Sequence, residues 1–450
     1  MIGLNKIGLN QVQLNRLRLN APFPTCRKMA GGSGSGDGFP QLPGDVTRWH
    51  FGGLTNEMMA AMDDPRIEDA DHKGRFLSFK NFAWKEGSGI SDVYPGALVF
   101  DGVDDCGTCN NFPVLTKEKG YTVVALRQWD QDFLNTTLTG GLLSTRNYST
   151  GEGVAFEKIE SSNKGYWNLG AGGIIDFAKS PFTWQTSKQY NNVGILKGDK
   201  NHGKPLCVGS GLSGGQQCGR FAIWELVFLD HDATEEELTK IKDYFVKTYP
   251  WLFPDQAWTV VGKTNEDEDR ATIANITGNG NDLVCLNLGF IEGSGYNEEG
   301  EYAGYLVTDG VDDKITSSTF EMGNDWTVIG DWELINTGKN DNAGIVKFDS
   351  IVIYNYNPIL INIKNGRNNL IPDQNTVNAI CSDGRIYSKD WKESIYNEET
   401  ESTSKNLLTI GYSGNSYTKI AFKNLAIYPT VLSKEDCIKA YNYLQTLKAK

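Results

Sequence analysis

Short runs that alternate apolar and polar residues recur along most of the chain, and two of them end at an Asp-Gly pair. Residues Ala97 to Asp105 are ALVFDGVDD, and residues Tyr305 to Asp313 are YLVTDGVDD. β-Branched and aromatic residues favour strands. An Asp-Gly pair favours a turn, because Gly adopts a positive φ and Asp can bond its own backbone. This pattern predicts an all-β chain of short strands joined by turns.

Near the end of each large segment the pattern becomes helical. Thr234 and Ser433 are candidate N-caps, and each is followed three residues later by an acid, Glu237 or Asp436. Apolar residues then recur at three- and four-residue spacing, which predicts a short helix at each place. The apolar stripes are Leu238, Ile241 and Phe245 in the first helix and Ile438, Tyr441 and Leu444 in the second. Pro250 should end the first helix.

The two large segments correspond to each other in order and spacing. The stretch FAIWELVFLDHDATEEELTKIKDYF from Phe221 aligns with IAFKNLAIYPTVLSKEDCIKAYNYL from Ile420. Earlier blocks align too, as TVV from Thr122 does with TVI from Thr327. Such self-similarity indicates duplication. We therefore divide the chain into an arm over 1–20, a flexible Gly/Ser-rich linker over 21–40, and domains over 41–254 and 255–450.

The arm repeats every five residues, as IGLNK, IGLNQ, VQLNR and LRLNA. A helix would scatter its apolar side chains, and an unbroken strand would turn over its apolar face at every repeat. Either the Asn after each apolar triplet turns the chain into a small coil, or a straight strand is buried on both faces among other chains. Both solutions need a partner, so we predict an anchor rather than a disordered tail. The anchor residues are Ile2, Leu4, Ile7, Leu9, Val12, Leu14, Leu17 and Leu19.

Composition narrows the classes of partner. The formal net charge is −13, which argues against binding a nucleic-acid backbone. No run approaches the ~18 apolar residues that insertion into a membrane requires, and the start does not resemble a secretory signal. Eight cysteines are few for a disulfide scaffold in 450 residues, so we expect synthesis in a reducing cytoplasm.

Strands ending in L-x-F-D-G-x-D-D, with a closing strand A-x-W-x-L-x-F before T-E-E-E-L, resemble the concanavalin A-like and laminin-G-like sandwich family. The resemblance covers both large segments. It implies two tandem concanavalin A-like β-sandwich domains of the jelly-roll type, each closed by a short C-terminal helix. Such sandwiches serve as lectins, glycosidases, adhesion modules and scaffolds, so the fold does not determine the function.

The segment GKTNEDEDRATIANITGNGNDL, from Gly262 to Leu283, resembles virion proteins of tailed bacteriophages of gut Bacteroidales, crAss-like phages included. The resemblance implies a head or tail fibre or a capsid decoration, synthesised in the host cytoplasm and placed on the exterior of the virion. We expect a homo-oligomer whose residues 1–20 bind other virion proteins and whose sandwiches face host surface polysaccharide. The alternatives are a packing module of the virion without glycan binding, and a bacterial surface lectin or glycan-active enzyme.

Catalytic patterns are missing from the sequence. Glycosidases of this fold carry paired carboxylates as E-x-D-x-x-E on one strand, and the chain has no such strand. The acidic clusters Glu68 to Asp71 and Glu266 to Asp269 lack alternation with apolar residues and suit solvated loops. No nucleophile motif lies near any of the four histidines. These are His50, His72, His202 and His231. We therefore predict that the chain is not an enzyme.

Two groups of residues suggest metal ions. The pairs Asp104/Asp105 and Asp312/Asp313 could supply oxygen ligands to Ca²⁺, although turn geometry alone also explains them. Four cysteines have no counterpart in the second copy, namely Cys106, Cys109, Cys207 and Cys218. They could bind Zn²⁺, form disulfides, or be unrelated buried thiols. The long gap between Cys207 and Cys218 favours the last interpretation.

Carbohydrate binding by a sandwich requires an aromatic ring that stacks on a sugar face, with polar groups around it. Most Trp residues in a sandwich belong to its core, so each candidate is also a candidate for packing. The carbohydrate-binding candidates are Trp167, Trp184 and Tyr190 in the first domain and Trp332, Trp391 and Tyr396 in the second.

Overall fold

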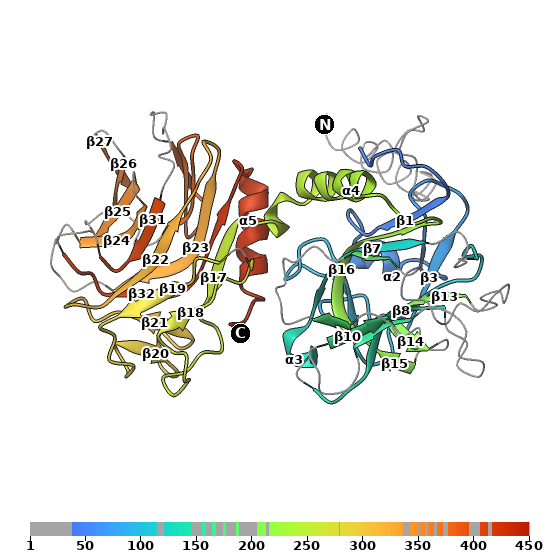
Figure 1. Ribbon diagram of the computed structural model, residues 1–450, viewed down its shortest axis with the longest axis horizontal. Coiled ribbons are helices and arrows are strands. Elements are labelled where there is room, and N and C mark those ends of the chain that lie inside the picture. The colour runs from blue at the N-terminus through green and yellow to red at the C-terminus, as the bar shows by residue number, and fades with distance from the viewer. Residues whose placement is uncertain are drawn as a thin grey trace, which may run out of the picture.

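A computed structural model shows an all-β protein with 41% strand and 13% helix, which confirms the predicted fold class (Figure 1). The residues it describes are 38–114, 121–134, 136–145, 155–158, 164–167, 174–176, 186–188, 205–212, 216–278, 280–335, 343–348, 351–355, 359–363, 367–371, 377–395, 406–412 and 416–449. The anchor arm and most of the linker lie outside these residues, so both remain predictions.

The described residues of the first half form two sheets. One contains β1 (Val46–His50), β4 (Gly89–Ile90), β5 (Leu98–Asp101), β7 (Thr122–Trp129), β12 (Thr186–Lys188) and β16 (Arg220–Leu229). The other contains β2 (Arg66–Glu68), β3 (Phe76–Lys80), β6 (Cys106–Cys109), β8 (Gly140–Ser144), β9 (Ala155–Lys158), β10 (Lys164–Trp167), β11 (Ile174–Asp176), β13 (Leu206–Val208), β14 (Ser210–Leu212) and β15 (Gln216–Cys218). Trp49, Leu98 and Phe228 from the first sheet and Leu77 from the second share one apolar core.

The second half has the same plan. One sheet contains β17 (Gln256–Thr259), β20 (Gly295–Asn297), β21 (Tyr305–Val307), β23 (Thr327–Leu334), β28 (Val377–Cys381), β29 (Arg385–Ser388), β30 (Glu393–Ile395) and β32 (Ile420–Tyr428). The other contains β18 (Thr272–Ile273), β19 (Leu283–Leu286), β22 (Lys314–Phe320), β24 (Ala343–Phe348), β25 (Ile351–Asn355), β26 (Ile359–Ile363), β27 (Arg367–Ile371) and β31 (Asn406–Ile410). Trp258, Leu306 and Trp332 pack with Ile315 and Leu408 between them.

Strand register repeats between the halves. β16 pairs antiparallel with β7, and β32 pairs antiparallel with β23. The strands β16 and β32 each carry a β-bulge at the same place. The bulged residue is Trp224 in β16 and Lys423 in β32. The shared bulge allows outer-face positions of the two halves to be matched one to one. The division at Pro254 remains our proposal for the domain boundary.

The described residues also include five short helical segments. They are α2 (Asn56–Ala60), α3 (Gln131–Leu134), α4 (Glu235–Thr248), η3 (Pro250–Leu252) and α5 (Lys434–Leu444). The predicted N-caps are present: Thr234 forms a capping box with Glu237, and the Ser433 hydroxyl accepts from the Asp436 backbone N–H at 3.1 Å. α4 ends before Pro250, as predicted. Among the described helices, none is long and apolar enough to cross a membrane.

The buried stripe of α5 differs from the predicted one. Ile438 and Tyr441 are only partly buried, whereas Cys437, Ala440, Tyr443 and Leu444 are buried. The reason is that α5 lies between the halves, as the centre of Figure 1 shows. It packs on its own sheet through residues such as Ala426, and Tyr443 turns toward the first half.

Tyr443 joins the halves through a buried contact. Its ring meets Trp224 edge-on with centroids 6.0 Å apart, and its hydroxyl donates to Gln128 Oε1 at 3.0 Å. Trp224 and Gln128 occupy the outer face of the first half's β16 and β7, and both are buried. Lys448 and Asp132 form an exposed ion pair at the rim of the same interface, with Nζ and Oδ1 2.5 Å apart.

We predict that Tyr443→Phe lowers the free energy of unfolding by about 1–3 kcal/mol, because Gln128 loses a hydrogen-bond donor inside a dry contact. Lys448→Ala is the matched control at the rim and should cost less than about 1 kcal/mol. Urea denaturation followed by tryptophan fluorescence measures both. Equal costs for the two variants would show that the contact is not buried in solution.

Candidate functional site

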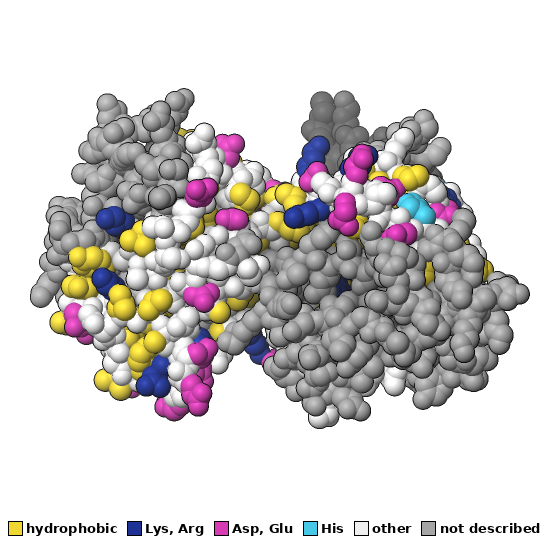
Figure 2. Space-filling model, viewed as in Figure 1, with side chains coloured by type: hydrophobic (Ala, Val, Ile, Leu, Met, Phe, Trp, Pro, Cys, Tyr) yellow, Lys and Arg dark blue, Asp and Glu magenta, His cyan; other side chains and the backbone are white. Residues whose placement is uncertain are grey.

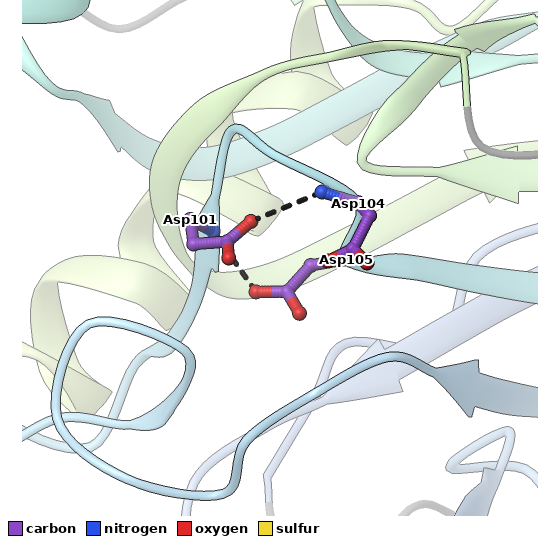
Figure 3. A group of neighbouring side chains, drawn as sticks. All are labelled: Asp101, Asp104 and Asp105. Atoms are coloured by element: carbon purple, nitrogen blue, oxygen red, sulfur yellow. Dashed lines mark hydrogen bonds between the residues drawn. The ribbon is translucent and has the colours of Figure 1, made fainter.

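The Asp-Gly turns are the first place where the chain brings acidic groups together. Gly102 and Gly310 both have φ of 76°, which confirms the predicted turns. Asp101 Oδ1 accepts from the backbone N–H groups of Val103 at 2.7 Å and Asp104 at 3.3 Å, as Figure 3 shows for Asp104. Asp105 Oδ2 accepts from the Asp101 backbone N–H at 2.9 Å.

Each turn gathers three carboxylates whose ligand atoms lie within 4.8 Å of one another. The triplets are Asp101, Asp104 and Asp105 in the first half and Asp309, Asp312 and Asp313 in the second. They could hold a hard cation such as Ca²⁺. Hydrogen bonds to the turn also account for Asp101 and Asp105 without an ion, so calcium stays a prediction. Burial raises the pKa of Asp105 to about 6, assisted by the charge of Asp101.

The structure does not support zinc binding by the four cysteines, which was one of the three interpretations of the sequence. Cys106 and Cys109 lie three residues apart on β6, so they point to opposite faces of the sheet. Cys109 enters the core, and burial raises the pKa of Cys109 and Cys218 each to about 11. The described clusters with metal-ligand geometry do not include these sulfurs. The zinc and disulfide interpretations are therefore withdrawn, and the structure shows buried thiols.

Of the aromatic candidates, one is wrong and one is well placed. Trp332 lies on the inner face of β23 with 1% of its surface exposed, so a sugar cannot stack on its ring. Trp391 is half-buried in the turn between β29 and β30 with a φ of 57°, which is rare for a bulky residue. The Trp167 side chain, Trp184, Tyr190 and Tyr396 lie outside the described parts of the chain.

Around Trp391, the outer face of the second half carries a group of polar and aromatic side chains that we call the aromatic–carboxylate patch. Its members are Tyr302, Tyr305, Asp331, Glu333, Lys389, Trp391, Lys423 and Tyr441. They come from β21, β23, β32, α5 and two turns. No short motif in the sequence joins them, because the sheet and α5 assemble them.

Asp331 is the centre of the patch. Its Oδ1 accepts from the Tyr305 hydroxyl at 3.1 Å. Lys423 Nζ lies 3.9 Å from Asp331 Oδ2 and 5.5 Å from the centroid of the Tyr305 ring. Burial, followed by the nearby Asp331 charge, raises the pKa of Tyr305 and of Tyr441. Both hydroxyls therefore stay protonated at neutral pH.

The second part of the patch surrounds Trp391. Its ring meets Tyr441 edge-on with centroids 5.7 Å apart. Glu333, two residues beyond Asp331 on the same face of β23, lies 3.9 Å from Lys389 Nζ through its Oε2. Glu333 is about one-third exposed and Lys389 about two-thirds, so both can reach a ligand. Acidic, basic and apolar side chains are likewise mixed on the visible described surface (Figure 2).

The equivalent face of the first half is closed. The register places Leu126, Gln128 and Trp224 where the second half has Asp331, Glu333 and Lys423. Tyr443 of α5 covers that apolar face, as described above. Of the two matching faces, the one in the second half is therefore open and the one in the first half is used for packing.

A buried polar network is the other arrangement that sequence reasoning missed. Glu225 is fully buried and its Oε1 lies 2.7 Å from His50 Nδ1. Arg48 Nη1 lies 3.4 Å from Glu225 Oε2, and the Tyr244 and Tyr249 hydroxyls donate to Glu225 Oε1 at 3.1 and 3.0 Å. These bonds compensate the buried carboxylate and tie β1 and β16 to α4 and the segment after it.

Comparison with known proteins gives weak structural similarity. No protein-family model and no curated protein matches the chain. A Trypanosoma rangeli sialidase in complex with sialic acid aligns at 9% identity over 84% of this chain and 67% of its own, with a TM-score of 0.31. The botulinum neurotoxin serotype D ligand binding domain in complex with N-acetylneuraminic acid aligns at 10% identity over 80% and 94%, with a TM-score of 0.30. The receptor binding domain of botulinum neurotoxin type G covers 42% and 50% at 12% identity, with a TM-score of 0.27.

These matches change one prediction. Because sialidases are enzymes, the matches contradict the prediction that the chain is not an enzyme, and we withdraw it. At this low similarity they assign neither a reaction nor a ligand to the chain.

We predict that stability falls as pH rises from about 4 to about 6, in part through Asp105. Its folded pKa of about 6 exceeds the ordinary value of 3.8, so the folded state binds the proton more tightly than the unfolded state. Asp105→Asn, which keeps the shape, should remove that contribution of up to about 3 kcal/mol. Urea denaturation at a series of pH values measures the difference. Asp104→Asn, at the exposed neighbour, is the control, and an identical pH profile for wild type and Asp105→Asn would contradict the prediction.

Proposed function

We propose that this chain is an attachment protein that binds a host-surface polysaccharide through the aromatic–carboxylate patch. The observation that carries the proposal is the open outer face of the second half. That face presents half-buried aromatic rings beside ordered carboxylates, where the first half has a covered apolar face.

The residue types suit a neutral, hydroxyl-rich sugar. An aromatic ring such as that of Trp391 stacks on the apolar face of a pyranose, and carboxylates accept hydrogen bonds from its hydroxyl groups. Glu333 and Lys389 are exposed enough to exchange their mutual contact for a ligand. Asp331 is already held by Tyr305 and Lys423, so it provides an acceptor in a fixed position.

The proposal also predicts how many binding sites each chain carries. Because Tyr443 covers the matching face of the first half, each chain should offer one such site. Multivalency would then come from several chains rather than from the two halves.

We further propose that the chain belongs to the exterior of a phage particle, as a fibre or capsid decoration made in the host cytoplasm. Support comes from the sequence: the resemblance of Gly262 to Leu283 to virion proteins, and a repetitive apolar arm on a flexible linker. Residues 1–20 would bind other virion proteins or identical chains. A packing module without glycan binding would lack the patch's affinity and is distinguished by the experiment below.

We predict that Trp391→Ala weakens binding to a host capsular polysaccharide at least tenfold, because one stacking contact of about 1.4 kcal/mol is lost. The measurement is a screen of full-length protein against immobilised capsular and O-antigen polysaccharides, followed by calorimetry with the strongest binder. The wild-type protein should show a stoichiometry of one binding site per chain.

Tyr412→Ala is the matched control. The Tyr412 ring lies tilted against the Tyr417 ring just beyond the end of β31, a strand of the other sheet, so its loss should leave the affinity unchanged. Equal loss in both variants, or no wild-type signal across the polysaccharides, would reject the glycan proposal in favour of a packing role.

We predict that deleting residues 1–20 leaves both halves folded but abolishes incorporation into the particle, because the arm supplies the anchor. Circular dichroism and thermal unfolding of the truncated chain check folding. Immunoblotting of purified particles checks incorporation. Normal incorporation of the truncated chain would contradict the anchor hypothesis.

A further inference from the structure

The Asp-Gly turn of the second half contains a buried carboxylate oxygen without a partner. Asp313 is fully buried, and its Oδ2 accepts from the Ser294 hydroxyl and from the Asp309 backbone N–H, each at 2.8 Å. Its Oδ1 is also buried, but no described residue donates a hydrogen bond to it. A buried carboxylate oxygen without a donor is costly, so we expect a group from outside the chain to pair with it.

The equivalent carboxylate of the first half has a partner for both oxygens. Asp105 is fully buried as well, and the Ser88 hydroxyl donates to its Oδ1 at 3.0 Å while the Asp101 backbone N–H donates to its Oδ2 at 2.9 Å. The two turns share the sequence DGVDD and the same glycine φ. Turn geometry therefore accounts for Asp105 but leaves one oxygen of Asp313 unexplained.

A second buried oxygen without a partner lies at the same end of the second half. Thr418 is 3% exposed, and its hydroxyl bonds no described residue. Its backbone N–H donates to the Gly411 carbonyl at 2.9 Å, and a Cβ on Gly411 would lie 3.6 Å from the Asp313 carbonyl oxygen. The first half has Gly219 where the second has Thr418, so the hydroxyl belongs to the second half alone.

Both side chains face the space between the two sheets of the second half. Asp313 stands two residues before Ile315, and Thr418 stands two residues before Ile420. Both isoleucines belong to the core between these sheets. Because side chains alternate along an extended chain, Asp313 and Thr418 face the same interior as the isoleucines. The two unpaired oxygens thus face inward at the end of the sandwich where the second acidic triplet gathers.

We propose that the second triplet, Asp309, Asp312 and Asp313, binds one Ca²⁺ ion and that the first triplet binds none. The ligand atoms of the three carboxylates lie within 4.8 Å of one another. Oxygens that bind one Ca²⁺ ion lie about 2.3–2.6 Å from it, so two ligands on opposite sides are about 5 Å apart. Water molecules complete the coordination of the ion, and such a water can also bond the Thr418 hydroxyl.

A cation fits this turn better than a proton does. Burial, followed by the neighbouring charges of Asp309 and Asp312, raises the pKa of Asp313. A proton on Oδ1 would remove the charge, but the resulting O–H would have no acceptor among the described residues. A divalent ion satisfies the charge and the free oxygen together. Ca²⁺ accepts irregular coordination, whereas Mg²⁺ demands a near-ideal octahedron, so a five-residue turn suits Ca²⁺.

Calorimetry of the full-length protein tests the site. The protein is stripped with EDTA, exchanged into chelator-free buffer and titrated with CaCl₂. The wild type should bind one Ca²⁺ ion per chain with a dissociation constant below about 1 mM. Excess CaCl₂ should raise the thermal unfolding midpoint, because the ion binds the folded state. Absence of binding would mean that buried water fills the site, and two ions per chain would mean that the first turn binds as well; either result overturns the proposal.

Asp312→Asn is the test variant. Asp312 is exposed, and the bonds that the structure gives it are made by its backbone, so the variant should fold. It should lose at least about tenfold in Ca²⁺ affinity. Asp104→Asn, at the same place in the first turn, is the matched control and should bind like the wild type.

Unchanged Ca²⁺ affinity in Asp312→Asn, or an equal loss in both variants, would reject the site. Titration with MgCl₂ should show weaker binding than titration with CaCl₂, and equal binding of the two ions would contradict the choice of Ca²⁺. None of these readouts uses a glycan, so the site can stand or fail independently of the proposed function.

Discussion

The packing of α5 against two sheets at once is the constraint on which the architecture depends. Its Ala440 and Leu444 pack with Ala426 of its own sheet, while Tyr443 reaches Trp224 and Gln128 of the first half. A helix with two apolar neighbours must bury more than a single stripe. The contact therefore determines which outer face of the duplicated fold is buried and which remains open to a ligand.

Local signals in the sequence predicted local structure well. The Asp-Gly turns and the N-caps at Thr234 and Ser433 were found because a few adjacent residues determine them. The buried stripe of α5 was predicted incorrectly. Helical periodicity in the sequence indicates one apolar face, and it carries no information about a second sheet that packs on the same helix. The C-x-x-C of Cys106 and Cys109 resembled a zinc knuckle, but on a strand three-residue spacing places the two sulfurs on opposite faces.

The candidate site was only partly predictable for the same reason. Trp391 stood among the sequence candidates, but Tyr305, Asp331, Lys423 and Tyr441 did not, because strand pairing and the position of α5 bring them together. Trp332 seemed equivalent to Trp391 in the sequence. Side chains alternate between the two faces of β23, so Trp332 faces the core while its neighbours Asp331 and Glu333 face outward.

The covered face of the first half has a consequence for assembly. This face contacts a helix, α5, that belongs to the second half. If the matching face of the second half bound the α5 helix of another chain, the repeated head-to-tail contact would generate an open filament. Docking a helix there would desolvate Asp331, Glu333 and Lys423, which stand where the first half has Leu126, Gln128 and Trp224. The charged residues on the outer face of the second half therefore disfavour a second contact of this kind.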